Sequence, residues 1–148
     1  MQFQREPIRN FIDDMFPLLE KHYQEIAHYH DIELNPDLEA YLANEEAGFL
    51  RTYTIRDHGK LVGYGVYFVR PNPHYKESLQ AVQDVIYLDQ PLRGNGEGMK
   101  FIAWCDEELK KDGVQVVYHH VKNKLNWGPA LEKMGYKLMD LIYARRLD

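Results

Sequence analysis

Three glycines at alternate positions mark residues 93–98, which read Arg-Gly-Asn-Gly-Glu-Gly. The run joins a β-rich segment to a segment of helical periodicity, so it should lie at the N-terminus of a helix. Unpaired N–H groups and the helix dipole favour an anion such as a pyrophosphate at that point, and Arg93 adds a positive charge. The run therefore indicates a phosphate-binding loop, with a tight structural turn as the alternative.

Two familiar phosphate-binding motifs do not fit this run. No Gly-Lys followed by Ser or Thr is present, so a phosphate-binding lysine and a magnesium-binding hydroxyl are both missing. Met99 occupies the position where a dinucleotide fingerprint needs its third glycine, and the next β-rich segment carries His119 and His120 instead of a ribose-binding carboxylate. The loop is thus of another kind.

Asp84 is a second candidate, because it interrupts the apolar run 82–88. A carboxylate in such a run must find a partner or face a cleft, and loss of water would raise its pKa. We interpret Asp84 either as a general base or as a hydrogen-bonded structural aspartate.

Hydrophobic periodicity predicts the elements that position these residues. The segments 81–88, 99–111 and 114–121 read as strand, helix and strand, and so short a unit requires two parallel strands with a right-handed crossover. Further helices are predicted over 8–26, from Asn35 and Pro36 to about Gly48, and over 129–134. Further strands are predicted over 49–56, 61–69 and 136–146, and a turn at 57–60 joins the first two of these strands.

This order of elements around Arg93-x-x-Gly96-x-Gly98 resembles the GNAT (N-acetyltransferase) superfamily, whose signature is Arg or Gln, two residues, Gly, one residue, and Gly or Ala. The resemblance extends over about residues 49–146, and the opening helices fit the family's first pair. The segment 127–136 is similar to the family's closing helix and its Gly–aromatic pair.

The runs 120–122 and 128–129 are similar to those of small GNAT proteins of bacteriophages and bacteria. The resemblance implies an α+β (α/β) fold. It has a mixed, mostly antiparallel twisted sheet, whose central parallel pair is splayed around the cofactor, with about four flanking helices.

The resemblance also implies roles for individual residues. The loop would bind the pyrophosphate of acetyl-CoA, while main-chain atoms of Tyr87 and Leu88 would pair with the pantetheine arm and supply an oxyanion donor. Asn126 would be a further cofactor contact, and Asp84 or a chain of waters would take the proton of the amine. The loop residues concerned are Arg93, Gly94, Asn95, Gly96, Glu97 and Gly98.

At one position the sequence departs from the family. Many members place a tyrosine four residues before the Gly–aromatic pair as the acid that protonates the leaving thiolate, and this chain has Leu131 there. Tyr87, Tyr118 and His119 are candidate replacements, with core packing as the alternative for the two tyrosines.

Composition narrows the classes of partner. The 148 residues, 45% of them hydrophobic, suit a single domain over 1–148, and a net charge of −5 offers no basic face for nucleic acid. No apolar run is long enough to cross a membrane, so we expect a cytoplasmic protein.

The lone Cys105 reads as a buried thiol. His28, His30 and Asp31 lack a second ligand cluster, so we expect no metal.

The leading interpretation is direct acetyl transfer from acetyl-CoA to a small-molecule or protein amine. One alternative is a catalytically weak or inactive GNAT-fold module that binds coenzyme A and acts through a protein partner, and Leu131 keeps this alternative open. Another is a protein that binds ATP or NAD through the glycine loop. The loop 70–77 is a candidate substrate rim, and the edge of the final predicted strand could pair with a second copy to form a homodimer.

Overall fold

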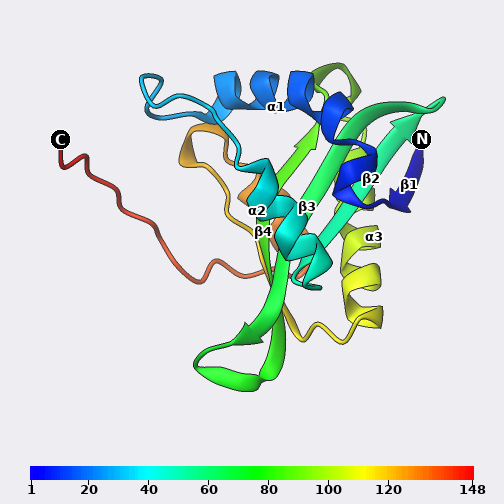
Figure 1. Cartoon of the computed structure of the whole chain (residues 1–148), viewed down its shortest axis with the longest axis vertical. Helices are drawn as coiled ribbons and strands as arrows, with labels where there is room; N and C mark the ends of the chain where they lie inside the picture. The colour runs from blue at the N-terminus through cyan, green and yellow to red at the C-terminus, as the bar shows by residue number, and fades with distance from the viewer.

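The computed structural model describes residues 1–148, and its five strands form one sheet in the order β1-β2-β3-β4-β5 (Figure 1). Neighbouring strands are antiparallel except β4 and β5, which are parallel as predicted. The strands are β1 (Gln2–Arg5), β2 (Leu50–Asp57), β3 (Lys60–Asn72), β4 (Tyr75–Leu88) and β5 (Val116–Tyr118).

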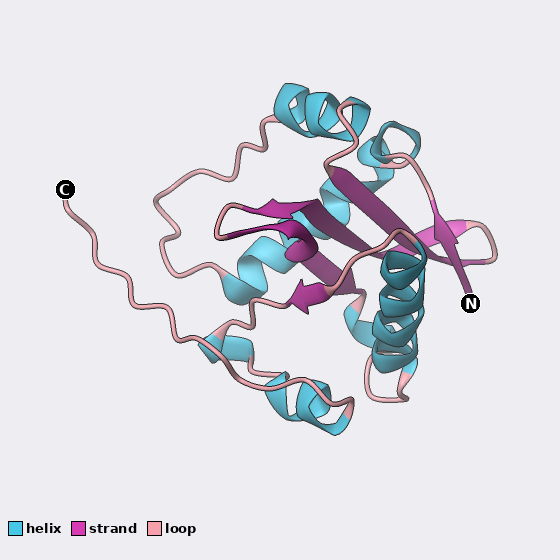
Figure 2. Ribbon diagram, turned by 90° about the horizontal axis from the view of Figure 1, so that it is seen from below, coloured by secondary structure: helices cyan, strands magenta, loops and turns pink.

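Helices cover both faces of the sheet (Figure 2). A single 3-10 turn at Ile8–Asn10 precedes the first α-helix, which contains Pro17. The α-helices are α1 (Ile12–Ile26), α2 (Leu38–Glu46), α3 (Glu97–Lys111) and α4 (Gly128–Lys133), close to the four predicted ranges. None of them combines the length and apolar character that crossing a membrane requires.

Two hydrophobic cores hold the layers together. One lies under the opening helix and joins Ile8, Phe11, Met15 and Leu18 to Leu50, Leu61, Tyr64, Val66 and Tyr87. The other lies under α3 and joins Phe101, Cys105 and Leu109 to Tyr53, Ile55, Val62, Tyr67, Val69 and Ala81. Cys105 is completely buried, as predicted, and burial raises the pKa of its thiol.

The hairpin between β2 and β3 forms where the sequence predicts it. His58 and Gly59 both have positive φ angles, 50° and 82°, which is the backbone of a two-residue hairpin turn. The next hairpin differs from the prediction, because β3 and β4 continue through the predicted loop 70–77 and leave only Pro73 and His74 between them.

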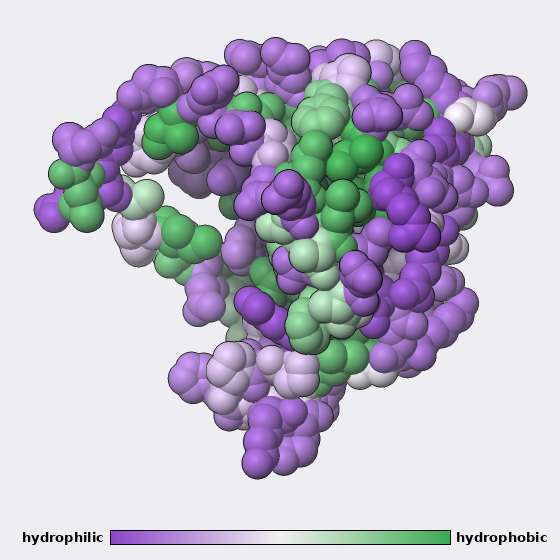
Figure 3. Space-filling view, viewed as in Figure 1, coloured by the Kyte–Doolittle hydropathy of each residue, from purple (hydrophilic) through white to green (hydrophobic).

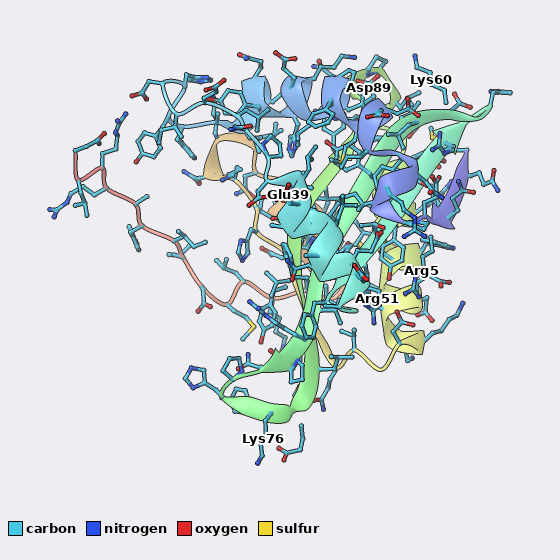
Figure 4. All side chains as sticks on the ribbon, viewed as in Figure 1. Arg5, Glu39, Arg51, Lys60, Lys76 and Asp89 are labelled. Carbon is cyan, nitrogen blue, oxygen red and sulfur yellow. The ribbon has the colours of Figure 1, made fainter.

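Strand β1 is absent from the sequence prediction. Its four residues pair with β2 from Gln2 opposite Arg56 to Arg5 opposite Tyr53. So short a segment carries almost no alternation, and the strand exists because β2 offers it a backbone edge. Arg5 and Arg51 both bind the Asp112 carboxylate, with N–O distances of 3.1 and 2.6 Å, and so tie the sheet to the end of α3 (Figure 4).

The strand predicted over 136–146 is wrong. The segment is extended but pairs with no strand, and it projects from the body in both views (Figures 1 and 2). Apolar residues of high β propensity form a strand only beside a partner backbone, and none lies alongside this tail. The parallel pair therefore lies at one edge of the sheet, whereas the prediction placed it in the centre. Near the tip, Arg146 binds Asp31 at 2.6 Å.

The start of α2 also differs by two residues from the prediction. Asp37, rather than Asn35, caps the helix, because its Oδ1 accepts a hydrogen bond from the N–H of Ala40 at 3.1 Å. The N-cap therefore follows Pro36, and Asn35 and Pro36 lie outside the helix.

Candidate active site

The parallel strands β4 and β5 part after three residue pairs, the last of which joins Val82 to Tyr118. Beyond this point the buried side chain of Gln83 bridges the gap, and its Oε1 accepts a hydrogen bond from the N–H of His120 at 3.1 Å. No strand pairs with this edge of β4 from Gln83 onwards. The end of β4 therefore presents unpaired backbone groups beside the diverging chain.

A β-bulge in β4 lies at the same place. Val85 pairs with Val66 and Gln83 pairs with Tyr67, so Asp84 is the extra residue with no partner on β3. A bulge redirects the side chain of its extra residue. Asp84 consequently lines a cavity of about 540 Å³ between α1, α2, β4 and the segment 120–127. Figure 3 shows the hollow on this face, with hydrophobic side chains on its walls.

The Asp84 carboxylate has one hydrogen-bond partner in the protein. Tyr41 Oη donates to Asp84 Oδ2 at 2.5 Å, which leaves Oδ1 directed to no protein donor. Loss of surrounding water raises the pKa of Asp84, while the Tyr41 hydrogen bond and the nearby His120 partly offset the rise. The same loss of water, with the bond to Asp84, raises the pKa of Tyr41. Asp84 is therefore a stronger base than an ordinary aspartate.

His22 from α1 is a further titratable group on the cavity wall. Its ring centroid lies 5.1 Å from that of Tyr87. Burial lowers the pKa of His22 to about 4, so the imidazole is neutral at pH 7. It adds no positive charge that would repel an ammonium group.

The glycine loop lies at the N-terminus of α3, as predicted. Gly94 and Gly96 have φ angles of 93° and 85°, and a Cβ atom added to either would meet no protein atom within 4 Å. Gly96 caps the helix without a side chain, and Asn95 Oδ1 accepts from the N–H of Glu97 at 3.2 Å. The N–H groups of Gly98 and Met99, in the first helical turn, have no helical partner. The loop is open and offers backbone donors, which suits a phosphate group.

Arg93 is held against the end of β4. Its Nε donates to the carbonyl of Leu88 at 2.7 Å, its Nη2 lies 3.0 Å from Glu25 Oε2, and its guanidinium lies 5.3 Å from the centre of the Tyr87 ring. The loop arginine is thus close to the predicted phosphate site but already paired with a carboxylate of α1.

The other predicted residues fall into two groups. Tyr87 and Leu88 lie beside Arg93, and the buried Tyr87 hydroxyl donates to Asp89 at 3.1 Å, with a pKa that burial raises to about 12. Asn126 adjoins the cavity residue Trp127, and its Oδ1 accepts from the N–H of Gly128 at 2.9 Å. Its amide N–H₂ makes no hydrogen bond to the protein.

Tyr118 and His119 do not line the cavity. His119 lies among the rings of Tyr67, Trp127 and Tyr136, at centroid distances of 5.3 to 5.7 Å, and neither ring nitrogen has a hydrogen-bond partner. Burial lowers its pKa to about 4, so His119 is neutral at pH 7. Tyr118 is half-buried at the end of β5, and Leu131 is buried in α4.

Sequence reasoning missed four residues of this region: Tyr41, His22, Gln83 and Glu25. Each acts through a contact between distant segments, such as the 43 residues that separate Tyr41 from Asp84. A buried amide and a helical tyrosine carry no local motif, so only the polar Gln83 within an apolar strand could have been noticed. No group of three His, Cys, Asp or Glu side chains is arranged to hold a metal.

Solved structures share this fold at low sequence identity. A ribosomal-protein-alanine N-acetyltransferase from Brucella melitensis biovar Abortus 2308 has a TM-score of 0.72 at 18% identity, with 99% of this chain and 100% of that chain covered. An aminoglycoside acetyltransferase from an uncultured soil metagenomic sample, in complex with sisomicin, has a TM-score of 0.76 at 13% identity, covering 99% and 96%.

A third neighbour carries the cofactor expected of the fold. It is a predicted acetyltransferase from Clostridium acetobutylicum with acetyl-CoA, with a TM-score of 0.70 at 14% identity and coverage of 99% and 96%. Among curated proteins, no sequence matches with significant similarity. Residues 7–136, however, match the acetyltransferase (GNAT) family. The chain is a member of the GNAT acetyltransferase family.

Proposed function

We propose that this protein transfers an acetyl group from acetyl-CoA to an amine. The observation that carries the proposal is the double role of β4. The strand brings Asp84 to the cavity at its bulge and ends five residues before the open glycine loop, at Leu88. Strand β4 would thus join the phosphate site at the glycine loop to the candidate base Asp84. Membership of the GNAT family supports N-acetyltransferase activity in general.

Acetyl-CoA would supply the acetyl group, activated as a thioester. The backbone N–H groups of residues 94–98, apart from that of Glu97, which donates to Asn95 Oδ1, would hold its pyrophosphate, with Arg93 as the neighbouring positive charge. The edge of β4 at Tyr87 and Leu88, which pairs with no strand, would bind the pantetheine arm in the manner of an added strand, although the Leu88 carbonyl already accepts from Arg93. Asn126 keeps a free amide N–H₂ for a further contact.

Asp84 would remove the proton that an ammonium group must lose before it can attack. Its raised pKa improves it as an acceptor, and Tyr41 fixes the orientation of its carboxylate. A module that only binds coenzyme A needs no such base in its cavity, so this pair favours turnover.

The proton that the leaving thiolate requires must come from a residue other than Leu131. Tyr118 and His119 lie at and after the end of β5, where the strands part, and Tyr87 lies five residues beyond that point on β4. The Tyr87 hydroxyl carries a proton at pH 7, whereas His119 lacks the imidazolium proton that a general acid donates, because burial lowers its pKa to about 4. Tyr87 and Tyr118 are therefore better candidates for the acid than His119.

Two matched glycine substitutions test the proposal. Gly96→Ala and Gly113→Ala both place a methyl group at a left-handed residue, with φ of 85° and 89°, at opposite ends of α3 and in open space. Each should cost about 1 to 2 kcal/mol of folding free energy. Only Gly96→Ala should weaken acetyl-CoA binding, at least tenfold by isothermal titration, because its methyl group fills space that the pyrophosphate needs.

Binding of acetyl-CoA to the unmodified protein, unchanged in Gly113→Ala, would support the assignment. Equal loss of affinity in both variants would mean that the loop has only a structural role. Tighter binding of ATP than of acetyl-CoA would overturn the proposal in favour of a nucleotide site.

A further inference from the structure

The cavity that holds Asp84 is mainly hydrophobic. Of its 25 lining residues, 16 are hydrophobic, and most of these come from α1, the segment between α1 and α2, and β4. Aromatic side chains contribute at two sides, with Tyr23 and Tyr41 from the first two helices and Trp127 from the segment before α4. A ligand of this cavity must therefore cover apolar surface.

Negative charge in the cavity is sparse and localised. Asp84 and Glu33 are the only carboxylates on its walls, and Glu33 lies on the exposed segment between α1 and α2. Lys122 adds a positive charge on another side. A polycation needs several carboxylates, whereas one ammonium group needs only one, and Asp84 Oδ1 is free to accept from it.

A peptide chain is also a poor match to these walls. Each peptide group brings a donor and an acceptor that lose water in the cavity, and every one left unpaired costs about 1 to 3 kcal/mol. Apart from tyrosine hydroxyls, the polar side chains of the lining are limited to three histidines, Gln83, Asn35, Glu33, Asp84 and Lys122. An apolar body on a single amine avoids this cost.

We propose that the acceptor is a small primary monoamine with an apolar body, of the arylalkylamine class. The ammonium group pairs with Asp84, and the apolar body lies between the aliphatic face of α1 and the aromatic side chains of Tyr41 and Trp127. This inference rests on the proposed function, since it identifies the acceptor of the same reaction.

A binding experiment without turnover tests the acceptor class. The protein, with and without coenzyme A, is titrated with 2-phenylethylamine, its neutral counterpart 2-phenylethanol, spermidine and an alanyl dipeptide. We expect 2-phenylethylamine to bind at least tenfold more tightly than each of the other three. Asp84→Asn should reduce the preference for the amine over the alcohol while leaving the affinity for the alcohol unchanged.

Ile32→Asp provides a second test on the apolar wall. Ile32 lines the cavity and is 55% exposed, so the substitution should leave the fold intact. It should weaken 2-phenylethylamine at least fivefold and strengthen spermidine. Leu42→Asp is the control, because Leu42 is 40% exposed on α2 and lies outside the cavity.

The outcomes separate the two proposals. Acetylation of spermidine or the dipeptide, with no binding of 2-phenylethylamine, would overturn the inference and leave acetyl transfer intact. Failure to bind acetyl-CoA, with tight binding of 2-phenylethylamine that depends on Asp84, would overturn the proposed function while supporting the site for a monoamine.

Discussion

Arg93 of the glycine loop and Glu25 of α1 form an ion pair, with 3.0 Å between Nη2 and Oε2. The Arg93 side chain also donates to the carbonyl of Leu88, so it links the loop, the end of β4 and the first helix. A phosphate group entering the loop would compete with Glu25 for this guanidinium and meet its negative charge.

Glu25→Gln should therefore tighten coenzyme A binding. The pair is partly exposed and worth about 0.2 to 1 kcal/mol, which corresponds to a decrease in Kd of up to about fivefold. Isothermal titration at low salt measures the change. Glu20→Gln is the control, because Glu20 is exposed on the same helix and makes no ion pair. Weaker binding in Glu25→Gln would mean that Glu25 positions Arg93 for the phosphate.

Tyr41→Phe should move the acidic limb of the activity profile to higher pH. The Tyr41 hydrogen bond favours the charged form of Asp84 and lowers its pKa, so losing the hydroxyl raises that pKa further. Asp84 must be deprotonated to accept a proton, and a higher pKa requires a higher pH. The pH dependence of kcat/KM reports this shift, with Tyr29→Phe as the control. An unmoved limb would exclude Asp84 as the titrating base.

Gln83→Ala should loosen the point at which β4 and β5 part. The substitution removes the acceptor of the His120 N–H and leaves a space in a buried position, at a cost of about 1 to 2 kcal/mol. Amide hydrogen exchange should become faster at His120 in particular. Gln24→Ala, at an exposed helical position, should change neither the free energy of unfolding nor the exchange rate at His120. Undiminished protection at His120 would show that Gln83 does not hold the strands.

Folding stability should fall in acid because of Glu6. Arg56, Thr54 and Gln4 all donate to its carboxylate, and Arg56 contributes most to lowering the pKa from 4.5 to about 2. A lowered folded-state pKa stabilises the protein above pH 4.5, and this contribution disappears as the pH falls toward 2. We expect a loss of about 1 to 2 kcal/mol in urea unfolding over this window. Glu6→Gln should show a correspondingly smaller acid dependence.

We propose that the C-terminal tail mediates a homodimer. Leu138, Leu141 and Ile142 are 76%, 67% and 76% exposed, and β5 has a free edge for an added strand. Sedimentation analysis should find a dimer that the double substitution Leu141→Asp with Ile142→Asp converts to a monomer, while Leu42→Asp leaves it unchanged. A monomer at every protein concentration would contradict this role of the tail.

Local patterns predicted much of this fold. The turn at His58 and Gly59, the helix at the end of the glycine loop and the parallel pair all follow from short-range signals of periodicity and turn chemistry. Strand β1 and the tail are the exceptions, because a strand depends on whether a partner edge lies alongside it. That property belongs to the whole chain and not to the segment.

The candidate site, like the fold, could be predicted from the sequence only in part. Asp84 and the loop were recognisable because a carboxylate in an apolar strand and alternating glycines are unusual locally. The bulge that turns Asp84 toward the cavity, and the Tyr41 hydroxyl that holds it, depend on register and on packing between distant elements. No spacing within the sequence encodes either of them.

The burial of Cys105 gives the chain an internal reporter of its own opening. It is the single cysteine, and its side chain is fully buried under α3. Its raised pKa keeps the side chain in the protonated thiol form, which is unreactive. A thiol reagent can label it only when α3 lifts from the sheet or the chain unfolds. The rate of labelling in native buffer therefore measures how often this helix detaches, without any added dye or engineered residue.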